Sequence, residues 1–316
     1  MRGGIGYQIT EIFNKSGIFQ PGTSKHVAKA QSRANGRTNS HQVGKDLYIY
    51  SYATAMTYKD VWHRFGKFIK AALDVYDIEK VAELHVREYL EHRINCGISH
   101  ETYKVETAAL HKLEKALNLY SDKFGKGNKY DFEAAIESTK DIAREELLSV
   151  ELSRAYENPE ELLENIAEEY MLASKIQFLG GARISEATLI LMSQCKGLVV
   201  DPVTLEVKGS IELTKTKGGR RRNIMVDRDT YNLLLEHMTK NNGVFRVSKA
   251  GYINEVKKAC RKAGEEYHGP HGLRWNFAAD RMVANQQSGH TYEQALVETA
   301  NQMGHSRGDI TEHYLK

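Results

Sequence analysis

Cysteine is scarce in this sequence of 316 residues, with only Cys96, Cys195 and Cys260. The three lie far apart and form no Cys-x-x-Cys pair. That spacing argues against a disulfide framework and against a zinc site built from cysteines. It fits a reducing compartment, so we expect a cytoplasmic protein.

Long apolar stretches are also missing. No run approaches the roughly 18 apolar residues that a membrane-spanning helix needs. The polar, basic N-terminus lacks the apolar segment of a secretory signal. With 41% apolar and 27% charged residues, the chain has the composition of a soluble globular protein, and its length suffices for two compact domains. We therefore expect no membrane partner.

The net charge of +3 at pH 7 conceals a strong asymmetry. Residues 1–45 hold seven basic side chains against one acid, Glu11, whereas residues 131–171 hold 13 acids and three bases. A third segment, 215–222, holds five cations, which are Lys215, Lys217, Arg220, Arg221 and Arg222. Segregated charge suggests a polyanionic partner for the basic parts. A solvated tail and a solvated turn would give the same pattern.

The first half predicts a basic arm followed by a helical domain. Residues 1–45 show no sustained period, and we interpret them as an arm that is disordered unless bound. Residues 46–150 predict four helices. The first two cover 57–76 and 78–94, the third begins after Ser99 or Thr102, and the fourth is the acidic stretch 131–150. The best boundary candidates are 121–131 and 149–159.

The second domain, 160–316, is predicted to be mainly helical with one small antiparallel sheet. Asn158 and Pro159 start a helix that runs to about Phe178, and Gly180-Gly181 ends it. A new helix begins near Ile184. Strands are expected at 198–200, 205–213 and 223–226, with a turn at 217–219. Helices are expected at 229–239, 252–263, 273–285 and 292–303, and a short one ends at Tyr314.

Six residues of this domain are candidates for catalysis, although each has a structural interpretation when taken alone. Arg183 can simply pair with Glu186 one turn later, and Lys217 lies at a hairpin tip where solvated charge is expected. His271 can be a turn or capping residue, and His305 can interact with the end of a helix. Tyr314 is one of 17 tyrosines, most of which serve packing. The sixth candidate is Arg274, three residues after His271, so both side chains can converge on one target.

Together these residue types suit phosphodiester chemistry without a metal. Two guanidinium groups can grip a phosphate and neutralise the charge that grows on a pentacoordinate phosphorus. A lysine can give a proton to the leaving 5′ oxygen. Histidines can take the proton of a tyrosine hydroxyl or hold the phosphate. A tyrosine can store the phosphate bond covalently.

Four segments resemble the signature of the tyrosine recombinase (phage integrase) family. Ala182–Glu186 resembles its Ala-Arg-x-Ser-Glu box, and Thr216–Val226 resembles its β-hairpin lysine motif. His271–Arg274 matches its His-x-Leu-Arg box. Gly304-His305-Ser306 matches its Leu-Gly-His-Ser box, with the tyrosine at the expected offset of nine residues. The resemblance is strong over about 180–316 and extends to the three helices at 48–120.

The resemblance implies a fold and a role for each residue. The fold class is mainly α, with an N-terminal helical core-binding domain (SAM-like) and a mainly helical catalytic domain with a small antiparallel sheet. Arg183 and Arg274 would clamp the scissile phosphate, and Lys217 would be the general acid, with Lys215 as its rival. His271 would be a general base or proton donor and His305 a phosphate ligand. Tyr314 would be the nucleophile that forms a 3′-phosphotyrosyl link. The DNA-binding candidates are Lys215, Arg220, Arg221 and Arg222, and Glu186 is expected to be structural.

The sequence departs from the family pattern in three places. Met303 replaces the usual leucine, which is a volume-conserving change, and Met225 stands where a proline is common. The chain ends at Lys316, two residues after the expected nucleophile. Many members continue into a segment that packs on a neighbouring protomer, so this mode of tetramer contact is in doubt.

The resemblance implies a site-specific DNA recombinase, an integrase of a phage or mobile element. Its partners would be double-stranded DNA, three further copies in a homotetramer on two DNA sites, and an accessory DNA-bending protein. No cofactor, ATP or metal is needed, because each bond is exchanged for one of similar energy. Two alternatives stay open: relaxation of supercoils as by type IB topoisomerases, and DNA binding without catalysis.

Overall fold

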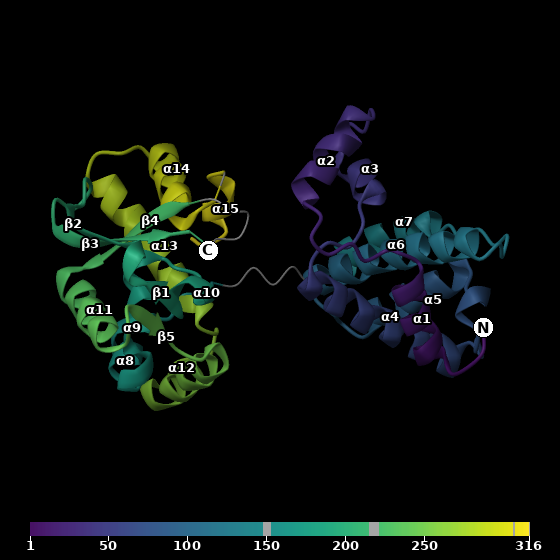
Figure 1. The fold of residues 1–316 in the computed structure, drawn as a ribbon, viewed down its shortest axis with the longest axis horizontal. Coiled ribbons are helices and arrows are strands. Elements are labelled where there is room, and N and C mark those ends of the chain that lie inside the picture. Colours follow the sequence, from purple (N-terminus) through teal and green to yellow (C-terminus); the bar gives the residue numbers. More distant parts are fainter. Residues whose placement is uncertain (148–152, 215–220, 306, 316) are drawn as a thin grey trace. The chain divides into compact units, whose positions relative to one another are not determined.

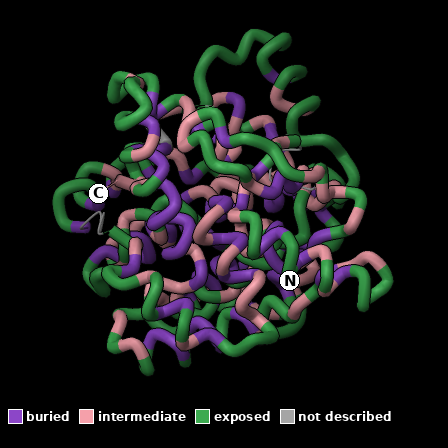
Figure 2. Tube along the Cα trace, turned by 90° about the vertical axis from the view of Figure 1, so that its left-hand side faces the viewer, coloured by how far each residue is buried: buried purple, intermediate pink, exposed green. Residues whose placement is uncertain are grey.

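The computed structural model describes residues 1–147, 153–214, 221–305 and 307–315. The chain forms two compact units, Met1–Val150 and Glu151–Lys316. Buried segments lie inside the units and exposed segments at their periphery (Figure 2). Among the described helices, none is both long and apolar enough to cross a membrane.

The elements that the structure describes in the first unit are helices (Figure 1), and an isolated parallel bridge pairs Phe19 with Ile49. α1 packs against α4 and α6, α4 packs against α6, and α5 packs against α7. The largest side chains of this core are fully buried aromatics, which include Trp62, Phe65 and Tyr89. Ser99 is the N-cap of α6, since its hydroxyl accepts from Thr102 N at 3.2 Å. The elements are α1 (Ile5–Lys15), α2 (Lys25–Ala34), α3 (Ser40–Asp46), α4 (Tyr52–Ala72), a 3-10 turn (Ile78–Lys80), α5 (Glu83–Asn95), α6 (His100–Lys123) and α7 (Glu133–Glu146).

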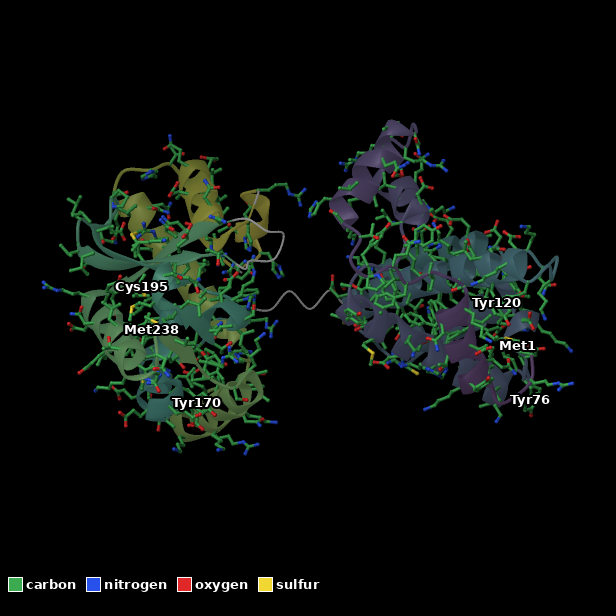
Figure 3. All side chains as sticks on the ribbon, viewed as in Figure 1. Met1, Tyr76, Tyr120, Tyr170, Cys195 and Met238 are labelled. Carbon is green, nitrogen blue, oxygen red and sulfur yellow. The ribbon has the colours of Figure 1, made fainter. Side chains whose placement is uncertain are left out.

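The prediction of a disordered arm at 1–45 is wrong, because this segment forms three helices, of which α1 belongs to the core. Ile9 and Ile12 of α1 are fully buried. Gly66 of α4 makes the approach possible, since a Cβ there would lie only 2.5 Å from the Ile9 side chain. The N-terminal amino group of Met1, labelled in Figure 3, pairs with Asp77 at 2.5 Å. The apolar residues of α1 recur at helical spacing, at Ile5, Ile9, Ile12 and Phe13. This period is too short to extend over 1–45, and burial in the core orders the helix.

The second unit confirms the expected class, mainly α with a small antiparallel sheet. A three-stranded sheet has the order β2-β3-β4, and α11 packs against β3 and β4. α13 packs against both α9 and α14. The elements are α8 (Pro159–Glu164), α9 (Glu168–Gly180), α10 (Ile184–Ala187), β1 (Leu189–Leu191), a 3-10 turn (Met192–Gln194), β2 (Cys195–Val200), β3 (Val207–Leu213), β4 (Arg222–Asp227), α11 (Arg228–Lys240), β5 (Val244–Arg246), α12 (Lys249–Ala263), α13 (His271–Gln287), α14 (Tyr292–Met303) and α15 (Asp309–Glu312).

Two features of this unit differ from the prediction. A second antiparallel pair joins β1 to β5, with Ile190 opposite Phe245. Each strand has only three residues, too few for a period to be visible in the sequence. The helix expected from Pro159 to Phe178 is divided into α8 and α9, because Ala167 has an extended backbone and its N–H donates to Glu255 at 3.1 Å. This long-range hydrogen bond supplies an acceptor for a backbone N–H that the break in the helix would otherwise leave unpaired.

Candidate active site

The first arginine segment follows a tight turn at the end of α9. Gly181 has φ +61°, and a Cβ there would lie 2.4 Å from the Phe277 ring, so only glycine fits. The turn places Arg183 at the N-cap of α10. Its backbone N–H donates to Glu186 at 2.8 Å and its guanidinium pairs with the same carboxylate at 3.2 Å. The structural pairing of Arg183 with Glu186 is therefore present.

Glu186 also accepts from a second arginine, Arg222, at the start of β4. The guanidinium of Arg222 makes two hydrogen bonds to this carboxylate, at 2.6 and 3.2 Å. Burial alone would raise the pKa of Glu186, but the bond from Arg222 and the nearby positive charges lower it overall. The side chain of Arg222 is only 7% exposed. In this structure the side chain is therefore an internal partner of Glu186, whereas the sequence predicted a surface position.

Arg274 on α13 holds three segments together from a fully buried position. Its guanidinium donates to the carbonyl of Gly181 and, at 2.6 Å, to the carbonyl of Met303. A further contact, at 3.1 Å, joins Nη2 to Nε2 of His305. Since arginine has no acceptor, Nε2 must accept, and the neutral ring of His305 carries its proton on Nδ1. The arginine thus fixes both the turn at Gly181 and the segment after α14.

The charges around Arg274 are not balanced. Arg183 and Arg222 share the one carboxylate of Glu186, and in the part of the chain that the structure describes no carboxylate pairs with Arg274. Burial, and then the charge of Arg183, lower the pKa of Arg274 to about 10. A buried excess of positive charge is costly unless an anion compensates it. The site therefore suits an anion.

Tyr314 lies beside the two histidines and this unpaired arginine. Its hydroxyl is 3.1 Å from Nε2 of His271, and the Arg274 guanidinium carbon is 5.9 Å from the centre of its ring. The His305 and Trp275 rings are 5.4 and 5.0 Å away, centre to centre. The half-buried phenol thus lies among aromatic rings, and its hydroxyl contacts a histidine.

Both histidines are held in the neutral form. Burial, and then the charge of Arg274, lower the pKa of His271 to about 4 and that of His305 to about 3. A neutral His271 can accept the proton of the Tyr314 hydroxyl. An anion bound by the arginines would offset their repulsion and raise the pKa of His271, which would strengthen it as a base.

Five of the six predicted catalytic residues lie in this cluster, namely Arg183, His271, Arg274, His305 and Tyr314. Lys217 lies outside the described residues, as do Lys215 and Arg220, and Arg221 is exposed.

The sequence did not reveal that the side chain of Arg222 is buried, because nothing in the sequence distinguishes this residue from its basic neighbours. It also gave no signal for the contact of Trp275 with Tyr314. Among the described side chains, no group of three His, Cys, Asp or Glu is placed to hold a metal ion.

We expect the Arg222→Ala substitution to lower the free energy of unfolding of the second unit by about 3 kcal/mol, because it removes one partner of a buried ion pair. Arg221→Ala, at the exposed neighbouring position, should change it by less than about 0.5 kcal/mol. Urea unfolding followed by Trp275 fluorescence in a Trp62→Phe background measures this unit alone, since the chain has two tryptophans. Equal effects of the two substitutions would contradict the internal role of Arg222.

Comparison with known proteins gives a structural likeness alone. No protein-family model matches the sequence, and no curated protein matches it. A structure of the Tn1549 transposon integrase in complex with circular intermediate DNA has a TM-score of 0.50 at 14% identity and covers 92% of this chain and 93% of that one. Its complex with transposon right end DNA has a TM-score of 0.48 at 15% identity, with coverage of 92% and 94%. The XerA recombinase has a TM-score of 0.38 at 15% identity, with coverage of 91% and 92%. The likeness that reaches 0.50 shows a similar fold.

Proposed function

We propose that the chain is a tyrosine recombinase that cuts and rejoins DNA through a phosphotyrosyl bond to Tyr314. The observation that carries this proposal is the contact of the Tyr314 hydroxyl with neutral His271, beside a buried arginine that has no carboxylate partner among the described residues. Nucleophile, base and anion site are thus adjacent. The Tn1549 integrase is bound to DNA in its structures, and the similar fold supports duplex DNA as the substrate here.

In the proposed reaction, the Tyr314 oxygen attacks a backbone phosphorus and its proton passes to Nε2 of His271. Arg183 and Arg274 stabilise the negative charge on the pentacoordinate phosphorus. The bond from phosphorus to the 5′ oxygen breaks, and that oxygen takes a proton to become a 5′-hydroxyl. We assign this proton to Lys217, in keeping with the resemblance. The 3′ phosphate remains on Tyr314 until a 5′-hydroxyl attacks it and reverses the step.

The same proposal assigns a different role to each unit. The second unit holds the reacting groups, and the helical first unit would hold the duplex. His305 has two tasks in this scheme. Its Nε2 contact keeps Arg274 in place, and its protonated Nδ1, buried without a protein partner, is a donor that a phosphate oxygen can use.

The test is covalent capture of DNA. Purified protein is incubated with fragmented DNA from its source, the reaction is stopped with detergent, and the attached DNA is sequenced. One recurrent sequence at the 3′ end of the captured strands, the end attached to the protein, is the expected result. Capture at scattered sequences would instead indicate topoisomerase-like relaxation. Tight DNA binding without any captured DNA would contradict the proposed chemistry and indicate a binding protein.

A further inference from the structure

The first unit contains a cavity of about 440 Å³ that the proposed reaction does not use. It is lined by the start of α2, by α3, by the segment 47–51, by the start of α4 and by the middle of α6. Ligand sites for small molecules commonly have volumes of about 300 to 1,000 Å³. Its volume is therefore that of a binding site, and the chemistry of its walls decides which ligand it suits.

The walls carry positive charge. Lys25, Lys45 and Lys112 line the cavity, and none of the described residues that line it is acidic. The N-terminus of α4 also reaches it through the N-cap Ser51, and Lys25 is the first residue of α2. Helix N-termini favour anions, because their first N–H groups have no partner within the helix. The cavity is thus built for a ligand with a negative group.

Lys112 is the cation that most needs such a ligand. Its ammonium group donates to the carbonyls of Gly44 and Leu47, both at 2.7 Å. By contrast, Lys45 has a carboxylate partner, Glu133, at 2.9 Å. Burial, and then the charges of Lys115 and Lys25, lower the pKa of Lys112 to about 8. The carboxylates of Asp46 and Glu114 offset this only in part, and the hydrogen bonds of the ammonium group go to carbonyls and not to a carboxylate.

Aromatic side chains form another part of the wall. Tyr48, Tyr50 and Tyr58 line the same cavity, and each is only partly exposed. Tyrosine presents a flat apolar face together with a polar hydroxyl. Nucleobases stack on such faces with a gain of about 1 to 3 kcal/mol per base. Lysines for a phosphate and tyrosines for a base thus occur in one cavity.

We propose that this cavity binds a nucleoside phosphate, with the phosphate on Lys112 and Lys25 and the base against the tyrosines. This nucleoside phosphate can come from either of two sources: a free mononucleotide, or a nucleotide within a DNA strand. The proposal is independent of the reaction at Tyr314, since all its residues belong to the first unit.

The test is calorimetric titration of the full chain with AMP, adenosine and inorganic phosphate. AMP should bind at least about tenfold more tightly than either fragment, because base and phosphate contribute together. Lys112→Met should weaken AMP binding by about tenfold or more. Lys123→Met is the matched control, because Lys123 lies on the same helix and also donates to a backbone carbonyl, that of Lys15 at 2.9 Å, but does not line the cavity. It should change the affinity by less than about threefold.

A measurement on the unaltered chain covers the case in which Lys112→Met fails to fold. An amine-acylating reagent at pH 8 should modify Lys112, and saturating AMP should slow this modification at least fivefold while leaving exposed Lys129 unaffected. The single strand (dA)6 separates the two sources. Protection by (dA)6 alone assigns the site to a strand, and protection by AMP assigns it to free nucleotides. Protection by neither, or equal binding of AMP and inorganic phosphate, would overturn the proposal.

Discussion

The Tyr314→Phe protein should form no detectable covalent complex with DNA, a loss of more than about 10³-fold, because the substitution removes the attacking oxygen. DNA binding should stay within about twofold. The half-buried ring keeps its volume, and among the described residues the hydroxyl contacts groups inside the protein, His271 at 3.1 Å among them. Labelled DNA retained on the denatured protein after electrophoresis measures the first quantity, and a gel-shift titration measures the second.

Tyr292→Phe is the control for this experiment. Tyr292 lies in the same unit, at the start of α14, and is 45% exposed. Its substitution should leave the covalent complex unchanged. If Tyr314→Phe still forms the complex at the rate of the unaltered protein, the nucleophile is another residue and the proposed mechanism fails.

The Arg274→Lys protein should form the covalent complex about 10² to 10³ times more slowly, although its charge is conserved. The guanidinium contacts the carbonyls of Gly181 and Met303 and the ring of His305 at once. A lysine ammonium has three donors on a flexible stem and cannot reproduce this planar arrangement while also binding a phosphate. The measurement is the single-turnover rate of complex formation per folded molecule.

Arg281→Lys is a close control, because Arg281 lies on the same helix and is also buried. It makes a forked pair with Asp201, at 2.6 and 2.9 Å, and has no contact with the cluster around Tyr314 in the described structure. The substitution should lower stability and leave the rate per folded molecule within about threefold. Equal rate losses for the two variants would show that Arg274 acts through stability alone.

Features of the fold that depend on neighbours in the sequence were predictable. A helix start is decided within three residues, so the cap could be narrowed to Ser99 or Thr102, and the structure shows that it is Ser99. The turn at Gly180-Gly181 could be predicted because the left-handed conformation favours glycine. The His271–Arg274 pair lies on one helix at a spacing of three, so the convergence of the two side chains follows from helical geometry.

Features that depend on distant segments were not predictable. Whether residues 5–15 fold depends on Gly66, more than 50 positions away, which leaves room for Ile9. The burial of Arg222 depends on Glu186, its partner 36 positions earlier. Likewise, the division between α8 and α9 rests on Glu255. In each case the local pattern is compatible with several outcomes, and the free energy of a long-range contact selects one.

By itself, the sequence determined the candidate residues and their order, through the resemblance of four short segments to a family signature. It also determined the mainly helical class of both units, because capping and periodicity are local properties. Only the tertiary structure decided that His271 contacts the Tyr314 hydroxyl, that Arg274 is buried with no carboxylate partner in the described part of the chain, and that Arg222 pairs internally with Glu186. Protonation and charge balance depend on burial and on neighbours brought together by folding. The chemistry of the site therefore arises at the tertiary level.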